Sequence, residues 1–221
     1  MSLKTWTAVD DYIAEKLLVA DPVQDETLRH NGASGLPAID VSAPQGKMLN
    51  LLARMCGART ILEIGTLGGY STIWLARALP ADGKLVSLEF DPHHAQTARE
   101  SIARADFGAQ VEVRVGAAAE TLPILAAEGA GPFDFIFIDA DKPSNPIYLD
   151  WALKLSRPGT IVVLDNVVRD GEVVNAANPD PRIQGTRAGF DLLAAEPRFD
   201  ATALQTVGAK GYDGFVLAIV R

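Results

Sequence analysis

The stretch Ile61-Leu62-Glu63-Ile64-Gly65-Thr66-Leu67-Gly68-Gly69-Tyr70-Ser71 decides the fold. It begins as a short apolar run typical of a buried strand, turns through three glycines and enters an apolar segment with helical spacing. Glycine lets the backbone approach a ligand or adopt a positive φ, and the start of a helix offers free backbone N–H groups. The order of strand, glycine turn and helix predicts the opening of a parallel sheet, whose ligands bind beyond the carboxyl ends of its strands.

After residue 60 the chain alternates between β-rich runs and segments with helical spacing. Further β-rich runs fall at 85–88, 111–115, 133–138 and 161–164, and the helical segments fall at 70–78, 92–105, 117–127 and 146–155. Residues 201–207 and 215–220 are two more strands, which residues 208–214 join as an antiparallel hairpin. We therefore predict one α/β domain over 1–221, with a Rossmann-like core at 60–221. This core has a mostly parallel sheet, helices on both faces and a C-terminal antiparallel hairpin.

Residues 1–59 form a helical extension in this prediction. Apolar residues recur at helical spacing in two places, at Val9, Tyr12, Ile13 and Leu17 and again at Met48, Leu49, Leu51, Leu52 and Met55. Each set predicts a helix with one buried face. Cys56 continues the second face, so we expect it in the core. Between the two helices, residues 32–44 are rich in turn-forming residues, and an extended piece at 38–42 is placed to cover a ligand.

The composition argues against several classes of partner. The chain carries 28 Asp and Glu against 20 Lys and Arg, a formal net charge of −8, whereas nucleic-acid binding depends on cationic side chains that neutralise phosphates. No apolar stretch approaches the roughly 20 residues of a membrane span, and the N-terminus lacks the apolar run of a signal peptide. The single cysteine cannot form an internal disulfide. We expect a soluble, cytoplasmic protein that binds a small molecule.

The glycine turn argues against a dinucleotide ligand. A dinucleotide fingerprint, G-x-G-x-x-G, needs its middle glycine beside the pyrophosphate, and Leu67 occupies that place here. Glu63, just before the turn, would repel a pyrophosphate but attract the ammonium and sulfonium groups of S-adenosylmethionine. A turn of this kind also occurs as a purely structural connection between a strand and a helix.

An acidic residue ends the second predicted strand. Glu89 follows Gly65 at close to the spacing of about 20 residues expected of a side chain that accepts hydrogen bonds from ribose hydroxyls. The alternative is that Glu89 caps the helix beginning at Pro92, but Asp91 can fill that position. The turn and Glu89 together favour an adenosine ligand.

Oxygen-bearing side chains follow two later strands. Asp139 comes directly after the run at 133–138, and Asp165 and Asn166 come after the run at 161–164. If these strands are neighbours, the three side chains converge at the edge of the sheet that carries the glycine turn. Two carboxylates and an amide oxygen suit magnesium, manganese or calcium, and we prefer magnesium because it keeps positions open for the adjacent oxygens of a catechol. Either motif alone also fits a helix cap or a turn.

Lys142 stands three residues beyond Asp139, close enough in a turn to face the same cavity. A divalent cation lowers the pKa of a nearby hydroxyl, and a neighbouring lysine can take the proton as a base. The alternative is a solvated lysine at the start of a helix. The histidines His30, His93 and His94 lie away from the strand ends, and we expect them on the surface.

Several of these segments resemble one enzyme family. They are the turn at 63–71, Leu88-Glu89-Phe90-Asp91-Pro92, Ile138-Asp139-Ala140-Asp141-Lys142, Leu164-Asp165-Asn166-Val167 and the closing residues 208–215. They are similar, in the same order, to the small cation-dependent O-methyltransferases that include catechol O-methyltransferase and the plant caffeoyl-CoA O-methyltransferases. The resemblance runs from about Ile39 to the C-terminus. It implies a class I methyltransferase fold with a seven-stranded sheet, often as a homodimer.

The resemblance also implies roles for individual positions. Contacts to S-adenosylmethionine are expected at Val41, Glu63, Gly65, Thr66, Tyr70, Ser71, Glu89, Gly116, Ala117, Ala118 and Asp139. Asp139, Asp165 and Asn166 match the family's metal ligands. Lys142 matches its catalytic base, with Asp139 beside it in the catalytic set.

The polar connection at 169–182 is expected to act as a lid over a phenolic acceptor, together with residues 38–42 and Tyr212. The resemblance is weakest there. It departs again near Asn145, where relatives commonly carry a tyrosine, so no particular acceptor is transferred to this chain. Three alternatives stay open: an NAD-dependent oxidoreductase, a metal-independent small-molecule methyltransferase, and a binding protein without activity.

Overall fold

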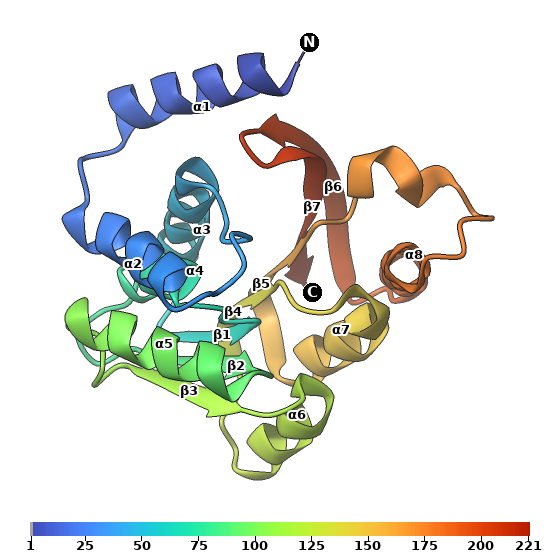
Figure 1. The fold of residues 1–221 in the computed structure, drawn as a ribbon. Helices are drawn as coiled ribbons and strands as arrows, with labels where there is room; N and C mark the ends of the chain where they lie inside the picture. The colour runs from blue at the N-terminus through green and yellow to red at the C-terminus, as the bar shows by residue number, and fades with distance from the viewer. Residues whose placement is uncertain (1) are drawn as a thin grey trace.

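A seven-stranded sheet runs through the computed structural model, which describes residues 2–221 (Figure 1). Its strands are β1 (Thr60–Ile64), β2 (Lys84–Glu89), β3 (Val111–Val115), β4 (Phe133–Ile138), β5 (Ser156–Asp165), β6 (Phe199–Gly208) and β7 (Gly211–Val220). The strand order is β3-β2-β1-β4-β5-β7-β6, and only β7 runs antiparallel to its neighbours β5 and β6. The predicted α/β fold, with its mostly parallel sheet and its C-terminal hairpin, is confirmed.

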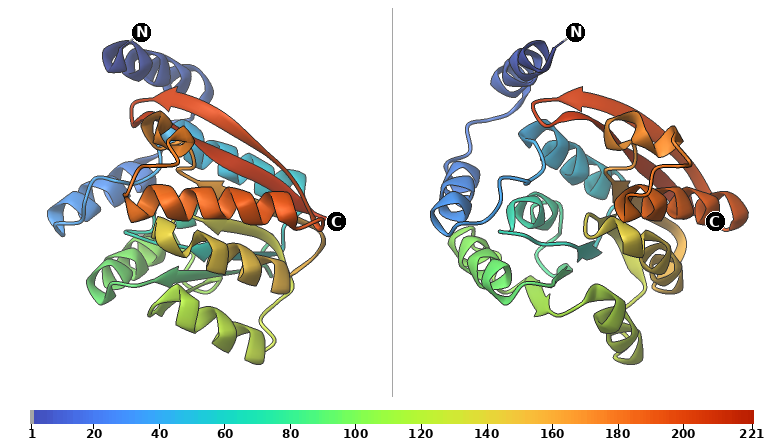
Figure 2. Two further views of the ribbon diagram at one scale, coloured as in Figure 1. Left: turned by 90° about the vertical axis from the view of Figure 1, so that its right-hand side faces the viewer. Right: turned by 45° about the vertical axis from the view of Figure 1, so that its right-hand side comes forward.

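Helices cover both faces of this sheet (Figures 1 and 2). The helices are α1 (Leu3–Leu17), α2 (Pro22–Ala33), α3 (Ala43–Met55), α4 (Tyr70–Ala76), α5 (Pro92–Arg104), α6 (Ala118–Ala127), α7 (Asn145–Lys154) and α8 (Pro181–Ala195), with short 3₁₀ turns η1 (Lys142–Ser144) and η2 (Arg169–Val174). The face covered by α3, α4 and α5 lies opposite the face covered by α6, α7 and α8. No helix formed by residues 2–221 is long and apolar enough to cross a membrane.

The central strands supply apolar side chains to two cores at once. Ile61 packs into the core under α3 and α4, whereas its neighbour Leu62 packs into the core under α6 and α7. On β4, Phe135 packs into the core under α3 and α4, and its neighbour Ile136 packs into the core under α6 and α7. Every residue of β4 is buried, as expected for a parallel strand with helices on both sides. The carboxyl ends of β1 and β4 are therefore held in place from both faces.

The prediction that α1 buries one apolar face is wrong for the single chain. Val9, Tyr12 and Leu17 each expose more than half of their surface, and α1 has no buried residue. The helix stands away from the sheet, and its main contacts are with α3 and β6 (Figure 2). Cys56 and Met55 also differ from expectation, because Cys56 is half-buried at the end of α3 and Met55 is 81% exposed.

Two helices and one turn differ from the sequence prediction. Helix α2 has no apolar stripe and instead buries Gln24, Thr27 and Asn31, so its pattern gives no helical signal. Helix α8 was not predicted, and it begins at the end of the expected lid at 169–182. The 3₁₀ turn η2 takes the first six residues of that lid, so only residues 175–180 remain without helical structure between η2 and α8. The predicted connection at 208–214 is a two-residue turn, because β6 and β7 continue to Gly208 and Gly211.

Candidate functional site

The glycine turn lies where the strand order reverses between β1 and β4. Gly65 follows β1 with φ of +100°, and a Cβ built on it would lie 2.0 Å from the carbonyl oxygen of Asp139. Asp139 follows β4 and donates its backbone N–H to the carbonyl of Ile64 at 2.8 Å. The structure therefore brings the turn and the first expected metal ligand into direct backbone contact, at the edge where open α/β sheets bind ligands.

Glu63 lies beneath the turn with no exposed surface. Its carboxylate accepts hydrogen bonds from the hydroxyls of Ser71 at 2.6 Å, Ser87 at 2.6 Å, and Thr72. Burial raises the pKa of Glu63 to about 7, and the three hydroxyls only partly offset that effect. Glu63 and Ser71, which were both expected to contact the cofactor, thus belong to one buried hydrogen-bond network. Ser87 and Thr72 also belong to this network, and the sequence analysis did not predict their part in it.

Glu89 holds the backbone of the glycine turn. Its carboxylate accepts the N–H groups of Thr66 at 3.1 Å and Leu67 at 2.8 Å, and also that of Asp91 at 3.0 Å. Leu67 has φ of +48°, a conformation that the bond from its N–H helps to hold. Two carboxylate oxygens offer about four acceptor positions, so these three bonds leave capacity for a ligand hydroxyl. Asp91 caps α5 through its bonds to His93 and His94, as the sequence analysis expected.

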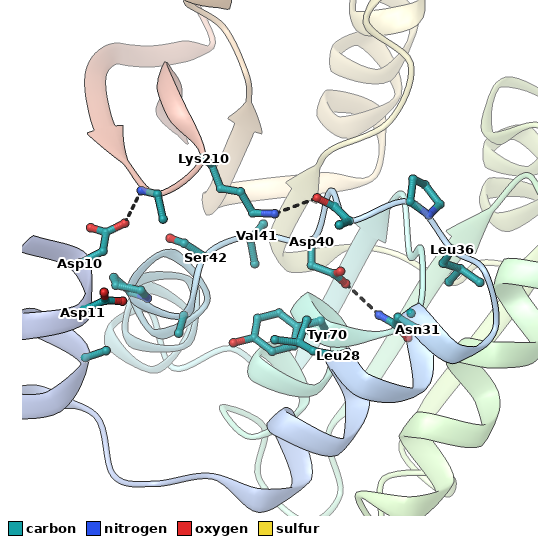
Figure 3. A pocket seen from close by; sticks show the side chains of 17 residues that line it. Asp10, Asp11, Leu28, Asn31, Leu36, Asp40, Val41, Ser42, Tyr70 and Lys210 are labelled. Atoms are coloured by element: carbon teal, nitrogen blue, oxygen red, sulfur yellow. Dashed lines mark hydrogen bonds between the residues drawn. The ribbon is translucent and has the colours of Figure 1, made fainter. Parts of the chain in front are cut away.

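The remaining expected cofactor positions surround the same edge. Gly116 follows β3 with φ of +144° and donates its N–H to the carbonyl of Glu89 at 2.9 Å. Ala117 and Ala118 open α6, whose first turn has no side-chain cap. Val41 and Tyr70 are buried on the far side of the turn and line a cavity of about 410 Å³ between α1, α2 and the loop before α3 (Figure 3).

That cavity does not contain the expected catalytic residues. Its polar side chains include Asp10, Asp11, Asp40 and Lys210, while Asp139, Lys142 and Asp165 do not line it. Asn31 donates to Asp40 at 2.9 Å and Lys210 donates to the carbonyl of Ala38 at 3.0 Å, so the loop before α3 is fixed from two sides (Figure 3). The cavity is therefore lined by this loop and is separate from Asp139, Lys142 and Asp165.

Asp139, Asp165 and Asn166 lie at the carboxyl ends of two neighbouring parallel strands, as the metal hypothesis requires. Asp165 is 4% exposed and accepts the N–H of Asn166 at 2.8 Å. Burial, followed by the negative charge of Asp139, raises the pKa of Asp165 to about 7. Lys142 is 7% exposed and donates to Asp139 Oδ1 at 2.8 Å. The structure thus gathers the proposed base and both carboxylates.

The donor set fits a hard divalent cation. Among residues 2–221, no Lys, Arg or His forms an ion pair with Asp165, although this carboxylate is buried beside a second one. A buried carboxylate without a paired cation is costly, and a bound metal ion would remove that cost. Within the same residues no group of three or more His, Cys, Asp or Glu could hold a metal ion, so a metal site here would need the amide oxygen of Asn166 as its third protein ligand.

Asp141 stands beside these groups but faces a different set of partners. Its carboxylate accepts hydrogen bonds from Ser144 at 2.6 Å and from the phenol of Tyr148. Behind this segment, α8 packs so closely that a Cβ on Gly185 would lie 2.2 Å from the carbonyl of Lys142. These contacts fix the turn that carries Lys142.

The structure also shows residues that the sequence did not single out. Gln45, on the first turn of α3, donates from Nε2 to Asp165 Oδ2 at 2.7 Å. Asn31, on α2, packs against the glycine turn, because a Cβ on Gly68 would lie 1.9 Å from its amide oxygen. Both side chains come from the segment before residue 60, and no local motif marks either of them. Two of the three histidines lie away from the site, since His30 pairs with Glu100 and the exposed His93 with the carbonyl of Ser34. His94 differs from expectation, because it is half-buried and its Nδ1 lies 3.6 Å from Glu89 Oε1 at the end of β2.

The segment expected to act as a lid is held by the C-terminal hairpin. Asp213 accepts the N–H groups of Val168 and Arg169 at 2.9 and 3.0 Å. A Cβ on Gly171 would lie 3.6 Å from the ring of Tyr212, which therefore packs against η2. Arg187 of α8 donates to the carbonyl of Val173 at 2.6 Å. Tyr212 and η2 thus pack against each other, and η2 is the segment that follows the expected metal ligands Asp165 and Asn166 in the chain.

Comparisons with known proteins identify the relatives of this chain. The model of a family described as O-methyltransferase matches residues 13–219. A catechol O-methyltransferase from Niastella koreensis is 51% identical over 221 residues, which is 100% of both chains. The crystal structure of an O-methyltransferase from Bacillus cereus in complex with SAH superposes with a TM-score of 0.99 at 57% identity and covers 100% of both chains. The O-methyltransferase TomG from Streptomyces achromogenes, involved in tomaymycin synthesis and solved with SAM, superposes with a TM-score of 0.96 at 49% identity, covering 100% of this chain and 99% of that one.

Proposed function

Because this chain belongs to the O-methyltransferase family, we propose that it transfers the methyl group of S-adenosylmethionine to a phenolic hydroxyl of a small molecule, and that it does so with a divalent metal ion. The cofactor has the stronger support, since two of the similar structures contain SAH or SAM. The proposals for the metal ion and for the acceptor are supported by the residues of this chain. The observation that carries them is that Asp165 is buried beside Asp139 and forms no direct ion pair with a cationic side chain of residues 2–221, although Lys142 lies near enough for its charge to act on Asp165.

The geometry suits the binding of adenosine and a sulfonium at the glycine turn. Glu89 offers acceptor capacity for ribose hydroxyls, and Gly65 leaves room for a ligand beside the backbone of Asp139. Above its raised pKa of about 7, Glu63 places a negative charge under the turn while its own oxygens are already bonded to hydroxyls. It would therefore favour a positively charged ligand without direct contact. An NAD-dependent oxidoreductase is disfavoured for the same reason, because a pyrophosphate is an anion.

The proposed chemistry needs three roles from this chain. Asp139, Asp165 and Asn166 would hold the metal ion, which when bound lowers the pKa of an adjacent acceptor hydroxyl. Lys142, in its neutral form, takes the hydroxyl proton at Nζ. The acceptor oxygen then bonds to the methyl carbon as the carbon–sulfur bond breaks, and the thioether product leaves. The protein contributes chiefly by holding both reactants at the shared edge of β1, β4 and β5.

The decisive experiment is metal removal. We expect the purified protein to methylate members of a panel of catechols, to lose that activity in EDTA and to recover it when magnesium is added in excess. Activity that EDTA does not change would point to the metal-independent methyltransferase instead. S-adenosylhomocysteine should raise the melting temperature with or without EDTA, whereas NAD should not. A protein that binds neither would contradict the cofactor assignment.

We also propose a homodimer. The support is the exposed apolar side chains of α1, which include Val9, Tyr12 and Leu17 and have no partner surface among residues 2–221. Light scattering should give twice the mass of the chain. The double substitution of Val9 and Tyr12 by Asp should lower that mass toward one chain, and a monomeric parent protein would contradict this proposal.

A further inference from the structure

We propose that Gln45 is a positioning residue that fixes the orientation of Asp165 for binding a divalent cation; this inference rests on the proposed metal site. Gln45 Nε2 donates a 2.7 Å hydrogen bond to Asp165 Oδ2, and the two residues are 120 positions apart in the chain. The bond joins α3 of the N-terminal segment to the end of β5. It is a direct link between that segment and the proposed ligands.

The carboxylate of Asp165 is fixed by one donor on each oxygen. Oδ1 accepts the N–H of Asn166 at 2.8 Å, and Oδ2 accepts Gln45. These two bonds set the rotation of the carboxylate plane and leave each oxygen a further lone pair. Asp165 itself ends β5, which is paired with β4 on one side and β7 on the other. With its backbone fixed by the sheet, the side-chain orientation depends on these two donors.

Gln45 is itself held firmly. Its backbone N–H donates at 3.3 Å to Ser42 Oγ, the N-cap of α3. The next residue, Gly46, packs directly on the indole of Trp74, where a Cβ would lie 2.3 Å from a ring atom. This contact seats α3 closely against α4. The amide of Gln45 is therefore presented to Asp165 by the capped first turn of a helix that packs closely on its neighbour.

The chemistry of the amide matters as much as its position. A lysine or arginine at this place would also donate to Asp165, but its charge would compensate the carboxylate and compete with a cation. The neutral amide of Gln45 orients the oxygens and leaves their negative charge available. Partners of this kind, which hold a metal ligand without touching the metal, typically affect metal affinity by 10–100-fold.

The test measures metal binding directly. Manganese is titrated into the metal-free protein, and the free ion is followed by electron paramagnetic resonance. Gln45→Met keeps the length of the side chain and removes the donor, and we expect its Kd for manganese to rise about tenfold or more. Its affinity for S-adenosylhomocysteine, measured without metal, should stay within about twofold and shows that the variant is folded. The matched control is Gln96→Met, since Gln96 donates to Glu100 at 2.9 Å on the exposed surface of α5.

The outcomes separate this inference from the proposed function. If Asp165→Asn binds manganese as tightly as the parent protein, the metal site itself is wrong. If Asp165→Asn loses the ion but Gln45→Met binds it as tightly as the parent protein, only the positioning role is wrong. If Gln45→Met fails to fold, Gln45→Asn keeps a neutral amide on a side chain one methylene too short to make the 2.7 Å bond. Weaker manganese binding by that variant supports the inference, and unchanged binding contradicts it.

Discussion

A Cβ on Gly65 would lie 2.0 Å from the carbonyl oxygen of Asp139, so the glycine turn and the segment of the expected metal ligand touch through bare backbone. We expect Gly65→Ala to weaken S-adenosylhomocysteine binding and to lower the free energy of unfolding by more than about 2 kcal/mol. The φ of +100° alone costs a residue with a side chain about 1–2 kcal/mol, and the backbone of Asp139 must move as well. Urea unfolding and calorimetric titration measure the two effects.

Gly32 provides the control for that substitution. It lies inside α2 with nothing within 4 Å of its Cβ position, so Gly32→Ala should raise the free energy of unfolding slightly. Equal behaviour of the two alanine variants would show that the turn tolerates a side chain.

Lys142→Met should reduce turnover on a catechol by about 100-fold or more, because general base catalysis typically contributes at least that factor. Its Kd for S-adenosylhomocysteine should not change, since Lys142 bonds to Asp139 Oδ1 and not to the turn. Steady-state kinetics and calorimetry measure the two quantities. Lys154→Met, at an exposed lysine paired with Asp150, should leave turnover unaltered. A Lys142→Met enzyme with normal turnover would remove the lysine from the mechanism.

Glu63 should make the protein less stable as the pH rises. Its pKa is about 7 in the folded protein against an ordinary value of 4.5, so between these values the folded state keeps a proton that the unfolded chain has released. The free energy of unfolding therefore falls from pH 4.5 to pH 7, by up to about 3 kcal/mol, and is level above that range. Urea unfolding at pH 5 and pH 8 should show that Glu63→Gln loses less stability across this range than the parent protein. The same comparison with the exposed Glu15→Gln should show no difference.

Two aspartates on neighbouring strands should respond in opposite ways to substitution by asparagine. In EDTA at pH 8, Asp165→Asn should raise the free energy of unfolding by about 1 kcal/mol or more, because it removes a buried charge that burial and Asp139 disfavour. Asp134→Asn should lower it, because Asp134 accepts bonds from Arg59, Thr60 and Arg157 that hold its pKa below the ordinary value. Magnesium should raise the melting temperature of the parent protein but not of Asp165→Asn. Lower stability of Asp165→Asn in EDTA would contradict the proposed reason for a cation at this site.

Much of the sheet follows from local pattern, and the differences have physical causes. All seven strands contain the predicted runs. The central strands β1, β2 and β4 are apolar because they are buried almost throughout, whereas the edge strand β6 is largely exposed and is marked by its β-forming residues. Helix α2 escaped prediction because it uses side-chain amides, such as Gln24 donating to the carbonyl of Tyr70, in place of an apolar stripe. Helix α8 carries Gly185 and Gly189 where it packs on η1 and α7, and glycine weakens the helical signal. The exposed face of α1 has the pattern of a buried helix, since a sequence pattern does not tell which molecule covers it.

Some residues of the candidate site could also be predicted from the sequence, and others could not. Residues at strand ends, such as Asp139 and Asp165, could be placed together once β4 and β5 were taken as neighbours, since parallel strands end at one edge. Gln45 could not, because its contact with Asp165 depends on the position of α3 over the sheet and has no counterpart in local sequence. The roles assigned to the cofactor, base and metal positions remain predictions that the experiments above address.

The place of β7 in the sheet bears on how the protein is made. The last ten residues before Arg221 lie between β5 and β6, so until they leave the ribosome the strand that ends in Asp165 has an unpaired edge. A nascent chain lacking them would expose β5 to chaperones and to aggregation. Truncation within β7 should therefore yield insoluble polypeptide, because β5 would keep an unpaired edge.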